Sequence, residues 1–141
     1  MLEKIHYDCL ILGAGISGLD VAYHIQKHCK WANYAILEKR GSLGGTWDFF
    51  RYPGLRSDTD MFIYGYSWKI WNSSKPIAQA EDILKYLTEA AEEQGIIKHI
   101  YFNTDVKSAD WSSTDNSWHL TTINGQRYVE YFDQANNSFE D

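Results

Sequence analysis

The sequence lacks any apolar run of the roughly 20 residues needed to cross a bilayer, so it predicts no transmembrane segment. It also lacks an excess of basic residues, because 13 Lys and Arg stand against 19 Asp and Glu and the net charge is −6. A general nucleic-acid-binding protein needs a basic surface for the phosphates, and electrostatic attachment to anionic lipid needs one as well. The charge therefore disfavours both classes, and we expect no nucleic-acid partner.

Cysteine is scarce. Cys9 and Cys29 have neither the spacing of a metal site nor that of a CxxC redox pair, and the five histidines have no ligand spacing. We therefore expect no metal site, and we interpret the cysteines as reduced thiols of a cytoplasmic protein. Glu3 and Asp8 are incompatible with the basic start of a signal peptide, and no small-residue cleavage site follows them.

The first 40 residues carry a strand–helix–strand pattern. Residues 7–12 form a short, mostly apolar run that ends at a glycine, which is typical of a strand buried on both faces. Residues 15–27 have apolar positions at the spacing of a helix that packs on a sheet, and residues 34–38 form a second short strand. The crossover should be right-handed and the two strands parallel. The fold class indicated is α/β, with a Rossmann-like parallel sheet.

A long loop and a second helix follow. Residues 40–57 carry four glycines and a proline, which predicts a structured loop of the kind that is often functional. Residues 60–71 are dense in aromatic side chains. Residues 78–94 predict a helix that ends at Gly95.

The remaining sequence changes to a period of about two residues, which predicts strands. Asn124–Gly125 is a good hairpin turn between two of them. We therefore expect a small antiparallel β-meander, one incomplete cofactor-binding domain over residues 1–133, and a polar tail over residues 134–141. The predicted strands cover residues 99–102, 106–111, 118–123 and 128–132.

Residues 13–18 have the pattern GxGxxG between the first strand and the first helix. Gly13 would permit the tight turn, Gly15 would let the backbone approach a pyrophosphate, and Gly18 would let helix and strand pack closely. The helix N-terminus would offer free N–H groups to the phosphates. Glu38, twenty positions after Gly18, can accept hydrogen bonds from the two ribose hydroxyls. This context predicts a dinucleotide site.

The motif alone leaves the choice between FAD and NAD open. Glu38 repels a 2′-phosphate and disfavours NADP at this site, although Lys39 and Arg40 weaken that argument. A second glycine pair, Gly44–Gly45, offers another close backbone approach, which we expect at the far end of the same cofactor. Gly45 is therefore a further candidate cofactor-binding residue.

Five longer segments together resemble a known family. They are GAGISG, LEKR, GGTWDFFRYPGLRSD, MFIYGYSW and ILKYLTEAAEEQGIIKHIYFNTDVKSADWS. These segments are similar to the class B flavoprotein monooxygenases, and most of all to Baeyer–Villiger monooxygenases of the branch that includes the ethionamide-activating enzyme. The resemblance covers about residues 7–120.

In that family two dinucleotide domains bind FAD and NADPH, and O2 is used to oxygenate a small-molecule ketone, aldehyde or sulfur compound. The resemblance implies that the FAD pyrophosphate is held by Gly13, Gly15, Ser17 and Gly18, and the ribose by Glu38. Further FAD contacts are implied for Thr46, Trp47, Asp48, Phe49, Tyr64 and the backbone of Val106. Arg56, Ser57 and Asp58 would face the nicotinamide cofactor, and Asp58, near the flavin, is the candidate catalytic residue.

Structural alternatives exist for several of these residues. Trp47 could anchor the loop, Asp58 could cap a turn, and Arg56 could be a solvated cation. We interpret four aromatic side chains of residues 60–71 as packing residues and not as the walls of a substrate-binding pocket. They are Tyr64, Tyr66, Trp68 and Trp71.

The resemblance fails near the C-terminus, where polar residues stand in place of the family's closing apolar strand and the family's second GxGxxG is absent. Three functions stay open: the N-terminal FAD-binding portion of an NADPH-dependent monooxygenase of Baeyer–Villiger or sulfoxidation type, a non-catalytic FAD-binding fragment or gene remnant, and an NAD-binding fragment of another oxidoreductase. The GGTW and RYPG segments favour the first two. We expect this chain by itself to be inactive.

Overall fold

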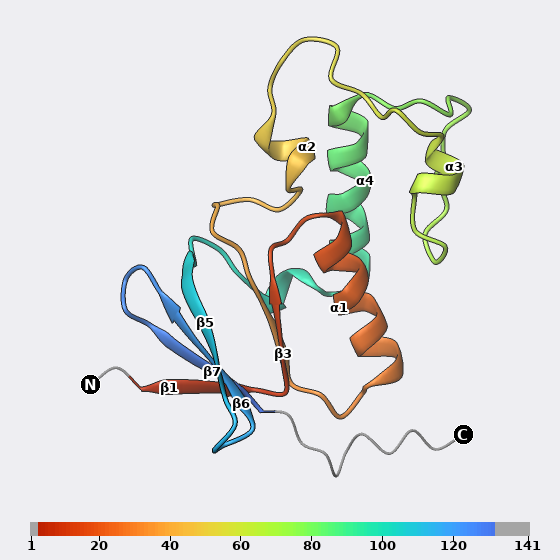
Figure 1. The fold of residues 1–141 in the computed structure, drawn as a ribbon. Coiled ribbons are helices and arrows are strands. Elements are labelled where there is room, and N and C mark those ends of the chain that lie inside the picture. The colour runs from red at the N-terminus through yellow and green to blue at the C-terminus, as the bar shows by residue number, and fades with distance from the viewer. Residues whose placement is uncertain (1–2, 132–141) are drawn as a thin grey trace.

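The computed structural model describes residues 3–131 and contains two sheets with helices beside one of them (Figure 1). A three-stranded parallel sheet has the order β2-β3-β4, and a four-stranded sheet has the order β1-β7-β6-β5. The predicted α/β class, with a parallel Rossmann-like sheet and an antiparallel meander, is confirmed. The elements are β1 Lys4–Tyr7, β2 Cys9–Leu12, α1 Ile16–His28, β3 Tyr34–Leu37, α2 Thr46–Phe49, α3 Met61–Tyr64, α4 Ala80–Glu93, a 3-10 turn at Ile97–His99, β4 Ile100–Tyr101, β5 Val106–Ser112, β6 Ser117–Thr122 and β7 Arg127–Tyr131.

β3 lies at the centre of the fold, and all four of its residues are buried. Successive side chains of a strand point to opposite faces. Ile36 packs in the cluster that includes α1 and α4, whereas Ala35 and Leu37 pack against the four-stranded sheet. The sheet is therefore covered on both faces, which explains why β3 is apolar throughout.

The predicted first strand at residues 7–12 is wrong in one respect, because the structure divides it at Asp8. β1 pairs in parallel with β7, whereas β2 pairs in parallel with β3. Asp8 makes the break: its backbone N–H donates to the Asn33 carbonyl at 2.9 Å, and its carboxylate accepts from the Asn33 N–H at 2.7 Å. The strand is also not buried on both faces throughout, because Leu12 is 55% exposed.

The two long helices lie close to their predicted positions. α1 covers the three-stranded sheet and has Lys27 and His28 in its last turn, where cations complement the helix dipole. α4 lies within the predicted range of residues 78–94 and buries Ile83 and Leu87. Short helices that the sequence did not predict, α2 and α3, lie in the long loop and in the aromatic segment.

The meander also matches its prediction. β5, β6 and β7 pair antiparallel in sequence order. The turn at Asn124–Gly125 is closed by the Thr122 N–H, which donates to the Gln126 carbonyl at 3.0 Å. The strand predicted at residues 99–102 is reduced to β4. The predicted tail at residues 134–141 lies outside the described residues.

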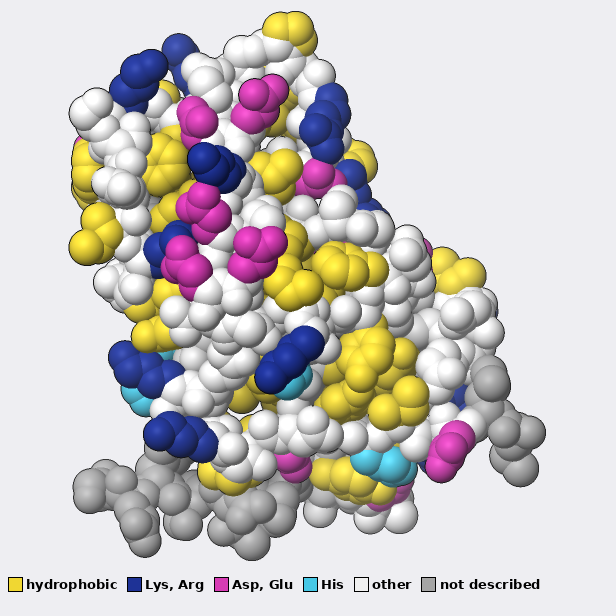
Figure 2. All heavy atoms as spheres, turned by 180° about the vertical axis from the view of Figure 1, so that it is seen from behind, with side chains coloured by type: hydrophobic (Ala, Val, Ile, Leu, Met, Phe, Trp, Pro, Cys, Tyr) yellow, Lys and Arg dark blue, Asp and Glu magenta, His cyan; other side chains and the backbone are white. Residues whose placement is uncertain are grey.

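Charged side chains of both signs are interspersed on the face seen from behind, and Figure 2 shows no continuous basic patch there. None of the helices within residues 3–131 has the length and apolar character that a membrane span requires.

Candidate dinucleotide site

The glycine motif forms the turn between β2 and α1. Gly13 has φ +100°, a conformation that favours glycine, and its N–H donates to the Leu37 carbonyl at 2.9 Å. A β-carbon on Gly18 would lie 2.0 Å from the Gly13 carbonyl oxygen, so α1 and the turn meet backbone to backbone. The conformational roles predicted for Gly13 and Gly18 are thus confirmed.

The N-terminus of α1 is open to a ligand. Gly15 is its N-cap, no side chain caps it, and no acidic residue stands in its first turn. The first N–H groups of a helix have no partner within the helix, and they carry the positive end of its dipole. Ser17 and Gly18 of this first turn line a hollow beside the glycine motif. The arrangement suits an anion such as a pyrophosphate.

The second glycine pair lies against the first glycine turn. Gly44 has φ +117°, and its N–H donates to the Ala14 carbonyl at 2.9 Å. A β-carbon on Gly45 would lie 3.1 Å from Gly15 Cα. The loop after β3 thus folds back over the N-terminus of α1 and brings the pair beside the first glycine turn. That this pair serves the far end of the cofactor stays a prediction.

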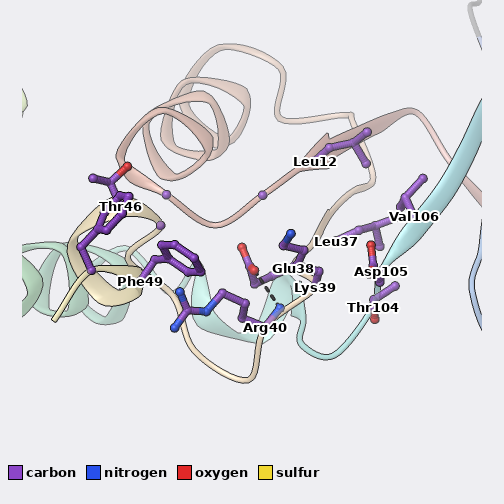
Figure 3. A pocket seen from close by; sticks show the side chains of 14 residues that line it. Leu12, Leu37, Glu38, Lys39, Arg40, Thr46, Phe49, Thr104, Asp105 and Val106 are labelled. Carbon is purple, nitrogen blue, oxygen red and sulfur yellow. Dashed lines mark hydrogen bonds between the residues drawn. The ribbon is translucent and has the colours of Figure 1, made fainter.

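Glu38 follows β3 and its residue is 6% exposed. Its Oε2 accepts the Ala14 N–H at 2.7 Å and its Oε1 accepts the Arg40 N–H at 2.8 Å, the bond drawn in Figure 3. Each carboxylate oxygen has two lone pairs, so one on each stays free for another donor. The carboxylate lines the first cavity described next.

The first cavity has a volume of about 520 Å³ and lies at the carboxyl ends of β2 and β3 (Figure 3). Ligands of open α/β sheets bind at that edge. The cavity brings together seven predicted site residues, namely Gly13, Gly15, Glu38, Gly45, Thr46, Phe49 and Val106. Lining residues that were not predicted as site residues are Leu12, Leu37, Lys39, Arg40, Phe50, Thr104 and Asp105. The position of Leu12 and Leu37 at strand ends is the signal that could have identified them.

Two further hollows continue from the first cavity. The second cavity, of about 310 Å³, shares Gly13, Gly15, Gly45 and Thr46 with the first and adds Ser17, Gly18, Trp47 and Tyr64. The third cavity, of about 170 Å³, shares Trp47 and Tyr64 with the second and adds Ser57 and Asp58. Shared lining residues thus connect the three cavities in order, from Glu38 and Val106, past the glycine motif, to Asp58, and we call this series the line of cavities.

Trp47 and Tyr64 join the second cavity to the third. The Trp47 indole N–H donates to the Tyr64 hydroxyl at 3.2 Å, and the two rings are edge to face with centroids 6.2 Å apart. Both residues also pack against the main core. Trp47 is therefore a loop anchor as well as a cavity wall, and the structural and functional interpretations of this residue are compatible.

Two predicted residues do not reach the cavities found in the described part of the chain. Asp48 points into the loop, where its carboxylate accepts from Arg40, Ser42 and Arg51 at 2.8, 2.6 and 2.7 Å. Arg56 is exposed and forms an isolated bridge with Gln79. This geometry disfavours a direct contact between Asp48 and the cofactor, because α2 turns the Asp48 side chain away from the first cavity.

Ser57 is held by the backbone. It is 3% exposed, its hydroxyl accepts the Ala78 N–H at 3.1 Å, and its own N–H donates to the Ala78 carbonyl at 2.8 Å. Asp58, the next residue, is exposed at the third cavity. The neighbouring backbone thus places Asp58 at the end of the line of cavities.

The other aromatic side chains pack as expected. Trp68 stacks between Tyr23 and Tyr66, with ring centroids 4.1 and 4.4 Å away, and donates to Asp20 at 2.8 Å. Trp71 is buried. Burial raises the pKa of the Tyr66 phenol far above its ordinary value, so it stays protonated, and it donates to the Ile16 carbonyl at 2.6 Å.

The cysteines are free thiols. Burial raises the pKa of the Cys9 thiol to about 11, which makes it a poor nucleophile at neutral pH. Within residues 3–131 no group of three His, Cys, Asp or Glu side chains could hold a metal ion.

Comparison with known proteins identifies the family to which the chain belongs. Residues 11–87 match the family model described as NAD(P)-binding Rossmann-like domain. The FAD-containing monooxygenase EthA of Mycolicibacterium smegmatis is 52% identical over 116 residues, which are 82% of this chain and 24% of that protein. EthA of Mycobacterium tuberculosis is 50% identical over 113 residues, which are 80% of this chain and 23% of that protein. This chain therefore spans about a quarter of the length of these relatives.

Solved structures agree with the sequence matches. An oxidized steroid monooxygenase bound to NADP superposes with a TM-score of 0.82 at 30% identity, over 89% of this chain and 25% of that one. An open crystal structure of cyclohexanone monooxygenase has a TM-score of 0.83 at 28% identity, over 92% of this chain and 26% of that one. The chain belongs to the NAD(P)-binding Rossmann-like domain family, and within it the sequence groups with the N-terminal portions of class B flavoprotein monooxygenases of the Baeyer–Villiger type.

Proposed function

We propose that this chain is the N-terminal FAD-binding portion of an NADPH-dependent flavin monooxygenase that uses O2 as co-substrate. The observation that carries the proposal is the line of three cavities, which offers groups suited to an extended dinucleotide in the right order. A ribose acceptor, Glu38, comes first, the open N-terminus of α1 follows, and an aromatic pocket with Trp47 and Tyr64 comes last.

The groups of the first and second cavities fit the adenosine and pyrophosphate of FAD. Glu38 has a free lone pair on each oxygen for the ribose hydroxyls. Gly15 and Gly45 meet without side chains, which leaves backbone surface for the phosphates. Thr46, Phe49 and the backbone of Val106 would complete the adenosine and pyrophosphate contacts.

The third cavity is where we expect the redox-active ring of the cofactor. Trp47 and Tyr64 form an apolar wall with a fixed orientation, because the indole donates to the phenol. Such a wall excludes water from the reacting centre. Asp58 is exposed beside that wall and is the candidate to hold or move a proton there. FAD, when bound, supplies electron transfer from NADPH and the reaction with O2.

The substrate we propose is a small molecule with a ketone, aldehyde or sulfur group. Relatives described as cyclohexanone and steroid monooxygenases support a carbonyl substrate. We also propose a cytoplasmic location, which is in keeping with the two free cysteines.

A second candidate is an FAD-binding portion without turnover of its own. The sequence contains a single GxGxxG motif, and the described residues offer one open glycine turn of this kind for a pyrophosphate. Hydride delivery from NADPH needs a second dinucleotide site. An NAD-binding fragment is a third candidate, which the identity of the bound nucleotide separates from the other two.

The test is to purify the chain, release any bound nucleotide by heat and record its absorption spectrum. We expect FAD, either retained or bound on addition. Gly15→Ala should weaken FAD binding, because a methyl group would stand where the pyrophosphate approaches. Release of NAD instead of a flavin, or equal FAD affinity in the wild type and in Gly15→Ala, would overturn the proposal.

A further inference from the structure

Arg40 stands two residues after Glu38 and also lines the first cavity, where its side chain runs towards Phe49 and not towards Val106 (Figure 3). The Arg40 N–H donates to Glu38 Oε1 at 2.8 Å, which keeps the Arg40 backbone beside that carboxylate. The guanidinium instead binds Asp48 Oδ2 at 2.8 Å and lies 5.1 Å from the centre of the Phe49 ring. Figure 3 shows this side chain running towards Phe49 and away from Val106.

Asp48 is the anchor that holds Arg40 in this position. Its side chain is 8% exposed, and both of its carboxylate oxygens are occupied. Oδ2 also accepts the Ser42 hydroxyl at 2.6 Å, and Oδ1 accepts Arg51 Nη2 at 2.7 Å. Charge-assisted hydrogen bonds of this kind are stronger than neutral ones, and burial reduces their screening by salt.

The Arg40 guanidinium does not use all of its N–H donors. Its Nη1 is buried and has no hydrogen-bond partner within the described part of the chain. An arginine near the ribose carboxylate is the group that accommodates a 2′-phosphate in dinucleotide-binding folds. A guanidinium also matches phosphate geometry better than an ammonium does, which distinguishes Arg40 from its exposed neighbour Lys39. Arg40 could therefore serve a phosphate if Asp48 released it.

We propose that Asp48 is a specificity-determining residue of the adenosine end of the first cavity. It holds Arg40 against α2 and leaves Glu38 as the charge that meets the ribose. The cavity thus rejects a 2′-phosphorylated adenosine and accepts an unphosphorylated one. Asp48 acts through Arg40 and is a positioning residue. The inference rests on the proposed function, in which FAD must occupy this cavity while NADPH is present as the reductant.

The experiment compares two probes that differ only in the 2′-phosphate, 5′-AMP and adenosine 2′,5′-bisphosphate. Their dissociation constants are measured by calorimetry on the 141-residue chain. The wild type should prefer AMP. Asp48→Asn should move the affinity ratio towards the bisphosphate by about tenfold, the effect of one charge-assisted hydrogen bond. A merely structural role would weaken both probes together and leave the ratio unchanged.

Three variants serve as controls. Asp48→Glu keeps the negative charge and should retain the preference for AMP. Ser42→Ala removes a neutral hydrogen bond to Asp48 but leaves the Arg40 ion pair, so its ratio should equal that of the wild type. Adding Arg40→Ala to Asp48→Asn should abolish the gain for the bisphosphate.

The outcomes separate the two proposals. A wild type that binds neither probe would overturn the proposed function together with this inference. A wild type that binds AMP, with an unchanged ratio in a folded Asp48→Asn variant, would overturn the inference alone. If circular dichroism shows that Asp48→Asn does not fold, the single variant Arg40→Ala tests the inference. Its ratio of AMP affinity to bisphosphate affinity should equal that of the wild type. A selective loss of bisphosphate affinity would show that Arg40 already reaches the phosphate in the wild type and would overturn the inference.

Discussion

Replacing Gly18 by alanine tests the packing of α1 on the glycine turn. A β-carbon there would lie 2.0 Å from the Gly13 carbonyl oxygen, whereas a close carbon–oxygen contact is about 3.3 Å. The obstructing atom belongs to the backbone and cannot rotate away, so α1 must move off β2. Overpacking of this kind costs about 1–3 kcal/mol, and the better helix propensity of alanine recovers up to about 1 kcal/mol.

Because the obstruction is backbone at 2.0 Å, we take the upper end of that cost, and we expect Gly18→Ala to lower the free energy of unfolding by about 2 kcal/mol. The assay is urea unfolding followed by far-UV circular dichroism, with the slope of the transition checked for constancy. Nucleotide affinity should fall as well, because the N-terminus of α1 moves with the helix.

Gly15→Ala is the matched control. Its β-carbon would lie 3.6 Å from Gly45 Cα, an ordinary contact, and Gly15 has φ −82°, which alanine adopts readily. We expect its stability to stay within about 0.5 kcal/mol of the wild type. An unfolding midpoint of Gly18→Ala equal to that of the wild type would refute the packing argument, and so would equal destabilisation by the two variants.

Three further predictions concern other parts of the molecule. Burial raises the pKa of Glu130 above its ordinary value, so the contribution of Glu130 to stability declines as pH rises from about 4.3 through the raised pKa. Glu130→Gln should therefore be more stable than the wild type at neutral pH. Urea unfolding midpoints of both proteins at acidic and neutral pH test this, because the difference in midpoint between them should shrink on acidification. Ser57→Ala should cost about 1–3 kcal/mol, because it leaves the buried Ala78 N–H without its acceptor; an unchanged thermal midpoint would contradict this. With FAD, NADPH and a simple ketone or sulfide, the 141-residue chain should form no oxygenated product in step with NADPH consumption. Its sequence holds one GxGxxG motif, and NADPH needs a dinucleotide site of its own. Oxygenated product that forms in step with NADPH consumption, measured by chromatography, would show that one dinucleotide site suffices.

The sequence by itself determined the features that depend on short segments. The glycine motif predicted the turn because φ +100° at Gly13 and the direct contact at Gly18 both require a residue without a side chain. Spacing placed Glu38 at the end of the second parallel strand. The apolar period predicted α4, and Asn124–Gly125 predicted the hairpin. Each of these rests on backbone preferences within a few residues.

Only the tertiary structure decided which surfaces meet. The division of the first strand at Asp8 depends on β7, more than 115 residues further along the chain, which no local pattern reports. The contact of Gly45 with Gly15 depends on how the loop after β3 folds back over α1.

The same holds for the direction of side chains on short, irregular segments. Asp48 and Phe49 are neighbours on one turn of helix, yet Asp48 is buried among cations and Phe49 lines the first cavity. A one-turn helix has no amphipathic period to read from sequence, so partners from other segments, such as Arg40 for Asp48, decide which way each side chain points. Local sequence thus specifies the elements of this site, and long-range packing specifies which of their side chains face the ligand.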